Sequence, residues 1–99
     1  MWVENMKSRS SGRPIAHQFI LTGLFNGTPG IAFQSFNKVI AIRLASGKIT
    51  LDANDWDSSP TTAKYRCRFL DETKQQTQLK IESGEIDLTD LNSLRSYYT

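Results

Sequence analysis

The sequence predicts an α+β fold, in which a small antiparallel β-sheet of roughly four to five strands packs on one α-helix. Three observations lead to this prediction. Residues 38–52 alternate between apolar and polar side chains around a Ser-Gly turn, residues 60–72 repeat apolar side chains with helical spacing, and residues 78–83 alternate again. The predicted element order is β-β-β-α-β-β, followed by a short C-terminal helical turn.

Length and composition indicate one globular domain. The chain has 99 residues, with 38% hydrophobic and 22% charged residues, which is typical of a globular protein rather than a disordered one. We predict a flexible N-terminal arm over residues 1–13 and a single α+β domain over residues 14–99. As an alternative, Trp2 and Val3 could hold the arm by adding to a sheet edge.

The first part of the domain predicts a strand and a loop. Residues 18–24 contain a β-prone apolar run with a glycine that weakens a helix, so we predict a strand there and leave a helix as the alternative. Residues 26–30, with the sequence NGTPG, predict a loop. The next strand begins with the alternation of Ile31 and Phe33.

The best β pattern is the hairpin around Ser46 and Gly47, which form a two-residue turn signal. A turn of this length would place Leu44 opposite Ile49. We therefore expect one buried apolar face and one face in water, as in an antiparallel sheet. The apolar face would carry Ile40, Ile42, Leu44, Ile49 and Leu51, and the opposite, polar face would carry Ala41, Arg43, Thr50 and Asp52.

The helix over residues 60–72 has a well-marked start. Ser59 is a good N-cap, because its hydroxyl can accept a hydrogen bond from a backbone N–H two or three residues on. Pro60 suits the first helical position, where its missing N–H breaks no helical hydrogen bond. Asp55 and Asp57 place negative charge next to the positive end of the helix.

The faces of this helix follow from its rotation of about 100° per residue. Lys64 and Arg68 share a solvated face, whereas Arg66 falls in the gap between two apolar stripes. Arg66 has two interpretations: its stem lies along the edge of the core with the charged head in water, or it is a paired or ligand-facing arginine. The two apolar stripes comprise Ala63, Cys67 and Leu70, and Tyr65 and Phe69.

The C-terminal third predicts a loop and two further strands. Residues 73–78 are polar and predict a loop, residues 78–83 predict a strand with Leu79 and Ile81 on one face, and residues 85–88 predict a short return strand. The final helical turn would be capped by Asp87 or Thr89, with Leu91 and Leu94 pointing inward and Tyr97 and Tyr98 either docked or free.

The composition also restricts the function classes. The single cysteine, Cys67, allows no intrachain disulfide and favours a reducing compartment, so we expect a cytoplasmic protein. No apolar run approaches the roughly 18 residues of a membrane-spanning helix, so we expect no membrane association. The net charge of +2 is mildly basic and falls short of a nucleic-acid-binding signature by itself.

The sequence offers no catalytic constellation. The single histidine, His17, lies far from Cys67 in the chain and cannot form a zinc site with it. Asp52, Asp55 and Asp57 resemble the start of a calcium-binding loop, but the glycine and the final glutamate of that loop are missing. We therefore predict a protein without enzymatic activity, cofactor or metal.

Several short motifs together resemble those of small phage-encoded proteins of uncharacterised function, over roughly half of the chain. The motifs are the segment Gln34, Ser35, Phe36 and Asn37, the strand residues Val39, Ile40 and Ala41, then Trp56, Ser59, Thr61, Thr62, Lys64, Tyr65, Phe69 and Leu70. Pro60 stands between the serine and the two threonines of the helix start, which departs from the spacing of that family. The resemblance implies a phage or prophage origin inside a bacterial cell and carries over no catalytic residue.

The expected function is therefore that of a small non-catalytic accessory protein, which binds and modulates or inhibits a host protein or complex. An antiviral defence complex such as CRISPR and the transcription machinery are examples, and self-association as a homodimer through a sheet edge is also open. Aromatic residues and arginine are the usual anchors of such interfaces. The candidate contact residues are Trp56, Lys64, Tyr65, Arg66 and Arg68.

A binding module for single-stranded nucleic acid or phosphate is the alternative. It would use the basic central helix, with Thr61 and Thr62 as a weak anion-binding pair at the helix start. Against this reading, acidic residues interleave with the basic ones along the chain and would repel a phosphate backbone. The acidic residues concerned are Asp55, Asp57, Asp71 and Glu72.

Overall fold

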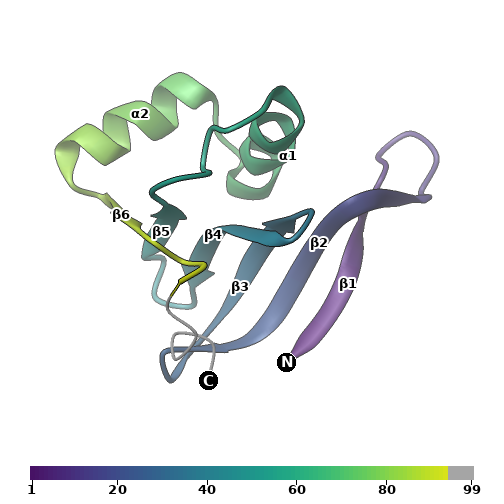
Figure 1. Ribbon diagram of the computed structural model, residues 1–99, viewed down its shortest axis with the longest axis horizontal. Helices are drawn as coiled ribbons and strands as arrows, with labels where there is room; N and C mark the ends of the chain where they lie inside the picture. The colour runs from purple at the N-terminus through teal and green to yellow at the C-terminus, as the bar shows by residue number, and fades with distance from the viewer. Residues whose placement is uncertain (94–99) are drawn as a thin grey trace.

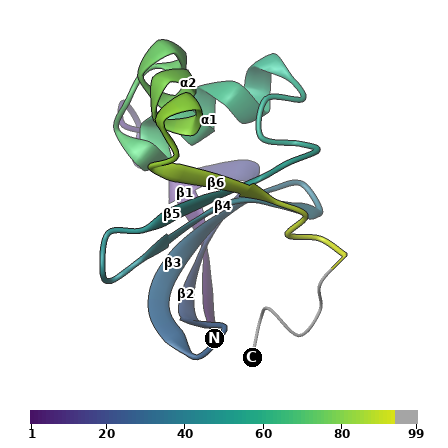
Figure 2. The ribbon, with the colours of Figure 1, turned by 90° about the vertical axis from the view of Figure 1, so that its left-hand side faces the viewer.

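The structure, a computed structural model, describes residues 1–93. It is a six-stranded β-sheet with two α-helices on one face (Figures 1 and 2). The strands are β1 (Trp2–Lys7), β2 (Pro14–Phe25), β3 (Thr28–Ser35), β4 (Lys38–Leu44), β5 (Ile49–Asp52) and β6 (Ile86–Thr89), and the helices are α1 (Pro60–Leu70) and α2 (Lys74–Ser83).

The sheet is mixed rather than wholly antiparallel. Strands β1 to β5 are antiparallel neighbours in chain order, and β6 adds to β5 in parallel. A parallel neighbour needs a long crossover connection, which α1 and α2 supply. The predicted α+β class is confirmed, whereas the predicted strand number, strand order and single helix are corrected.

The N-terminal residues form an edge strand. β1 pairs with β2, with Trp2 opposite Thr22 and Val3 opposite Leu21. Residues 2–7 are therefore not a flexible arm. They add to the edge of the sheet, which was the alternative prediction for this segment. The strand predicted over 18–24 is present within β2, and the loop expected over 26–30 is reduced to a tight Asn-Gly turn.

The hairpin of β4 and β5 exists, but its register differs by one residue from the prediction. Ile49 lies opposite Arg43 rather than Leu44. The amide of Gly47, whose φ is 95°, donates to the carbonyl of Leu44 at 2.8 Å, and the amide of Leu44 donates to the carbonyl of Lys48 at 2.9 Å. This is a three-residue loop with a glycine bulge, and its extra residue shifts the register.

Both faces of the central strands are buried, which corrects the predicted polar face. On the face covered by the helices, Phe33 packs against Phe69 of α1, with ring centroids 6.0 Å apart. The other face buries a second cluster that includes Leu91 from the chain after β6. Residues expected in water, including Thr50 and Asp52, are therefore buried.

Helix α1 begins as predicted, and helix α2 was missed. Ser59 caps α1, and α2 occupies the segment that we predicted as a loop and a strand. Thr73 and Gln76 form a reciprocal capping box at the start of α2. Leu79, expected on the buried face of a strand, is 65% exposed. The helix buries Thr77 instead, and a residue two positions further on lies on the opposite side of a helix.

The end of the described chain returns to the sheet. Strand β6 corresponds to the predicted return strand, and the buried Leu91 donates its amide to Asp52 at 2.9 Å. Residues 91–93 form a turn, whereas Leu94, Tyr97 and Tyr98, which we expected in a terminal helical turn and tail, lie outside the described residues. Neither α1 nor α2 has the length and apolar character that crossing a membrane would require.

Candidate functional site

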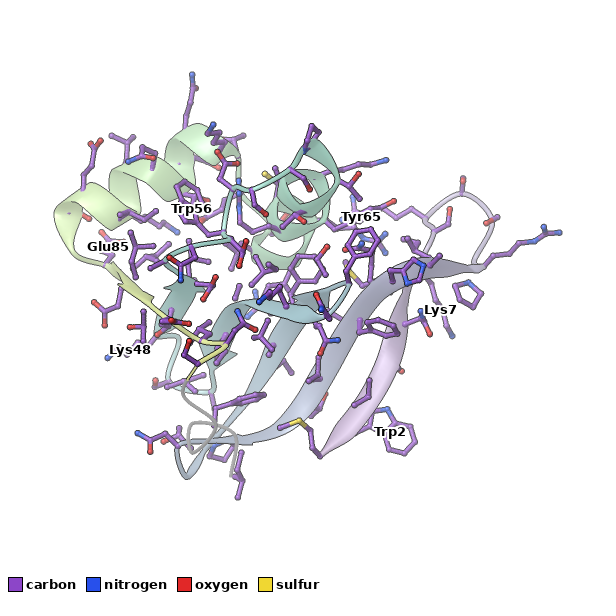
Figure 3. All side chains as sticks on the ribbon, in the orientation of Figure 1. Trp2, Lys7, Lys48, Trp56, Tyr65 and Glu85 are labelled. Carbon is purple, nitrogen blue, oxygen red and sulfur yellow. The ribbon has the colours of Figure 1, made fainter. Side chains whose placement is uncertain are left out.

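The structure separates the five predicted contact residues between two sides of α1. In Figure 3, Trp56 lies on the side toward α2, whereas Tyr65 lies near Lys7, where the β1–β2 hairpin stands beside the helix. Arg66 belongs to the Trp56 side, because its guanidinium lies over the Trp56 ring at 4.8 Å from the centroid. The two sides have different chemistry.

Arg66 is a buried structural residue. Its side chain has no exposed surface and donates to the Trp56 carbonyl and, at 3.1 Å, to the carboxylate of Asp57. The interpretation in which its charged head reaches water is therefore wrong, and the interpretation as a paired arginine is confirmed. A side chain with no exposed surface cannot contact a partner in this conformation.

Asp57 balances two cations on this side of α1. Its carboxylate accepts from Lys74 at 2.7 Å and from Arg66 at 3.1 Å. These contacts, the hydrogen bond from Lys74 above all, hold the pKa of Asp57 below its ordinary value despite partial burial. The charges of Arg66, Lys74 and Asp57 are therefore paired with one another within the protein.

The two threonines of the predicted anion-binding pair, Thr61 and Thr62, differ in exposure. Thr62 is 4% exposed, its amide donates to Ser59, and its hydroxyl is within hydrogen-bond distance of both Ser59 and Ser35, the latter at 3.0 Å. Thr61 is exposed. The hydroxyl of Thr62 therefore fastens α1 to the end of β3.

The other side of α1 borders a cleft. It has a volume of about 370 Å³ and lies between α1 and the connection that joins β1 to β2. Three of the predicted contact residues line it, Lys64, Tyr65 and Arg68. The sheet and the hairpin supply the rest of the lining, which is Ser8, Arg9, Ser10 and Ile15.

The cleft is positively charged. Its lining contains Arg9, Lys64 and Arg68 and, among the described residues, no carboxylate. None of these three cations forms an ion pair with another described residue, whereas other cations such as Lys48 are paired, in that case with Asp87 at 3.2 Å. Unpaired cations that converge on a concave surface create a local positive potential.

A hydrogen bond and a cation–π contact hold the residues that line the cleft. Arg68 donates to the carbonyl of Lys7, which ties α1 to the end of β1. The ammonium of Lys64 lies 5.2 Å from the centre of the Tyr65 ring. Lys7 and Glu4 line a second recess, to which Arg68 also contributes, so the carboxylate of Glu4 belongs to that recess and not to the cleft lining.

A stacked aromatic pair lies close to the cleft residue Ile15 along the chain. The rings of His17 and Phe36 lie 5.0 Å apart with an interplanar angle of 16°, and Phe36 is 52% exposed. Both residues have positive φ, 63° and 56°, which costs a bulky side chain about 1–2 kcal/mol. The amide of Phe36 donates to the carbonyl of His17 at 2.7 Å and holds the pair together.

An irregularity in β2 aims these side chains. The pairing of β1 with β2 shifts between Asn5 and Lys7, so that β2 contains extra residues around Ile15 and His17. Bulges of this kind redirect side chains. Ile15 lines the cleft, whereas His17 turns out to meet Phe36.

Sequence reasoning identified the helical wall of the cleft and missed the hairpin wall. Arg9 falls in the predicted flexible arm, and neither His17 nor Phe36 is among the predicted contact residues. One signal was available: Ser11 and Gly12 form the same dipeptide that marked the later hairpin, and Gly12 has a φ of 71°.

The acidic residues take structural roles. Asp52 accepts from the amides of Asp55 and Leu91, at 2.8 and 2.9 Å, so its carboxylate is occupied by backbone groups. Within residues 1–93, no cluster of three or more histidine, cysteine or acidic side chains is arranged to hold a metal ion.

Comparison of the chain with protein-family models, with curated proteins and with solved structures finds no match. The resemblance to phage-encoded proteins therefore stays an expectation from short motifs. The case for a function rests on the geometry of the site.

Proposed function

We propose that this protein is a small non-catalytic binding protein, which holds a partner carrying several negative charges in the basic cleft. The observation that carries the proposal is the set of three cations, Arg9, Lys64 and Arg68, which converge on one cleft and have neither an ion-pair partner nor a lining carboxylate among residues 1–93. An anion in the cleft would receive charge-assisted hydrogen bonds, which are stronger than neutral ones.

The structure weakens one objection to an anionic partner. Asp57 and Glu72, which interleave with the cations in sequence, are bonded to Lys74 and Lys80 at 2.7 Å in each case. Their charges are neutralised locally and their side chains do not line the cleft. A host protein with an acidic surface and a nucleic acid both carry the required charge.

Binding to heparin, a polyanion of neither partner class, tests the cleft directly. Arg9→Gln combined with Lys64→Gln removes two cleft cations. The matched control, Lys48→Gln combined with Lys74→Gln, removes the same charge elsewhere, and Lys48 lies far from Tyr65 in Figure 3. Each lost contact should lower the slope of log affinity against log salt by about 1, so the cleft variant should lose about 2.

The control variant should elute from a heparin column close to the wild-type protein. Similar early elution of both variants would show that net charge rather than the cleft governs binding, and would overturn the proposal. Melting temperatures measured in parallel separate lost binding from unfolding. Arg9→Gln, Lys64→Gln and Lys48→Gln are surface substitutions, which usually change stability by less than about 0.5 kcal/mol, whereas Lys74→Gln also removes a contact of Asp57.

A further inference from the structure

The stacked pair of His17 and Phe36 has no evident role in stability. Phe36 exposes half of its surface and occupies a left-handed backbone region that bulky side chains avoid, and His17 shares this region. Strained residues of this kind persist where the surrounding structure enforces them, and they gather at ligand-binding sites. The observation therefore raises the question of what the exposed ring faces contact.

The pair and the basic cleft are neighbours. His17 follows Ile15, a cleft residue, by two positions on β2, which is about 7 Å along an extended strand. Phe36 directly follows Ser35, whose hydroxyl is bonded to Thr62 of α1, the helix that forms the other wall of the cleft. The two rings thus come from segments that adjoin the strand and the helix lining the cleft.

We propose that the anionic partner is a single-stranded nucleic acid, whose phosphates lie in the cleft and whose bases stack on Phe36. This inference rests on the proposed function, because the cleft must first hold an anion. Proteins that bind single strands combine a basic groove with aromatic side chains that stack on successive bases.

The chemistry favours a nucleic acid over an acidic protein surface. An acidic protein surface would use the cations, and aromatic rings also anchor protein interfaces, but carboxylates offer no aromatic face on which Phe36 could stack. A base provides a flat face for such a ring, and stacking tolerates any base. A duplex keeps its bases stacked on one another, so it would offer its phosphates but no free base faces.

Fluorescence anisotropy with two labelled strands separates phosphate binding from base stacking. One probe is an oligothymidine of about 12 nucleotides, within the usual site sizes of single-strand binders. The other is an abasic strand of the same length, which has the same phosphates and no bases. The wild-type protein should bind the oligothymidine roughly 5- to 150-fold more tightly than the abasic strand.

Phe36→Asn is the informative variant, because asparagine tolerates the left-handed backbone that phenylalanine does not favour. It should lower affinity for the oligothymidine by about fivefold or more and leave affinity for the abasic strand unchanged. Its melting temperature should equal or exceed that of the wild-type protein, so loss of binding cannot be ascribed to unfolding. His17→Asn, which removes the ring beneath Phe36, provides a second test of the same kind.

The outcomes distinguish failure of this inference from failure of the proposed function. Equal affinity for the two strands, lost in both cases by Arg9→Gln with Lys64→Gln, would overturn base stacking and leave the anion-binding cleft intact. Binding of polyglutamate as tightly as the oligothymidine would identify an acidic protein surface as the partner and overturn the inference. No binding to either strand or to heparin would overturn both.

Discussion

The two sides of α1 use the same kinds of residue for different purposes. On one side, Arg66 has no exposed surface, lies over Trp56 and is paired with Asp57. On the other, Lys64 borders an open cleft, close to Tyr65, and has no carboxylate partner among the described residues. Both sides bring a cation and an aromatic ring together, but only the first supplies a counter-charge.

The difference shows how the cations divide between folding and binding. A buried charge is tolerated only where it is paired and hydrogen-bonded. Arg66 meets this condition through its two terminal nitrogens, whereas its Nε has no partner among the described residues, so its contacts contribute to the fold. Lys64 and Arg9 keep their charges exposed, which leaves them available to a ligand.

Removing Arg66 should have the largest effect on stability. Arg66→Ala deletes the largest of the fully buried side chains in the described residues, together with its contacts to Trp56 and Asp57. It should lower the free energy of unfolding by about 3–5 kcal/mol, as for other large buried residues. Urea denaturation measures this cost. Lys64→Ala, two positions away on the exposed face, should change stability by less than about 0.5 kcal/mol.

For heparin binding, we expect Lys64→Ala to have a larger effect than Arg66→Ala, which is the reverse of their order in stability. Lys64→Ala should weaken heparin binding, while the folded fraction of Arg66→Ala should bind like the wild-type protein. A stable Arg66→Ala variant with impaired binding would contradict the division between the two sides of α1, since it would make Arg66 a ligand contact.

Asp57→Asn should have a smaller effect of the same kind. It leaves Arg66 without its counter-charge and removes the partner of Lys74, and hydrogen bonds to charged groups are worth about 1.5–3 kcal/mol. We expect a loss of about 2 kcal/mol at neutral pH, measured by urea denaturation. Lys48→Gln, which breaks an exposed ion pair, is the matched control and should be nearly neutral.

The effect of Asp57→Asn should depend on pH. The pKa of Asp57 is lowered in the folded state, so its stabilising contribution is fully present above its unfolded pKa of about 3.9 and is lost as the pH falls through the folded value. The stability difference between the wild-type protein and Asp57→Asn should therefore be constant above about pH 5 and shrink below about pH 4. A difference that persisted unchanged to low pH would exclude the charge of Asp57 as its source.

Local signals predicted the fold where the deciding contacts are close in sequence. Ser59 and Pro60 specified the start of α1, because capping depends on neighbouring residues. The register of the β4–β5 hairpin was wrong because Gly47 adds a bulge that a simple Ser-Gly turn does not require. Thr73 and Gln76 carried the cap signal of α2, but the alternation of Leu79 with Ile81 was taken for a strand.

The site was predicted only as far as one helix. Lys64, Tyr65 and Arg68 share a region of α1 that helical spacing reveals, and all three line the cleft. Arg9 comes from the other wall, and its position depends on the pairing of β1 with β2. Arg66, by contrast, is buried because Trp56 and Asp57 cover it, and the periodic pattern of the helix does not predict this contact.

The smallest of these effects concerns α2, which supports only the buried side of α1. Thr73→Ala removes the capping hydroxyl that accepts from Gln76 at 3.1 Å, and should cost about 1 kcal/mol. Lys74, at the first position of α2, would then hold Asp57 less firmly, while the cleft has no residue from α2 in its lining. Thr73→Ser keeps the hydroxyl and should restore stability in urea denaturation. Heparin elution should be unchanged in both variants, and earlier elution of Thr73→Ala would show that the two sides of α1 are coupled.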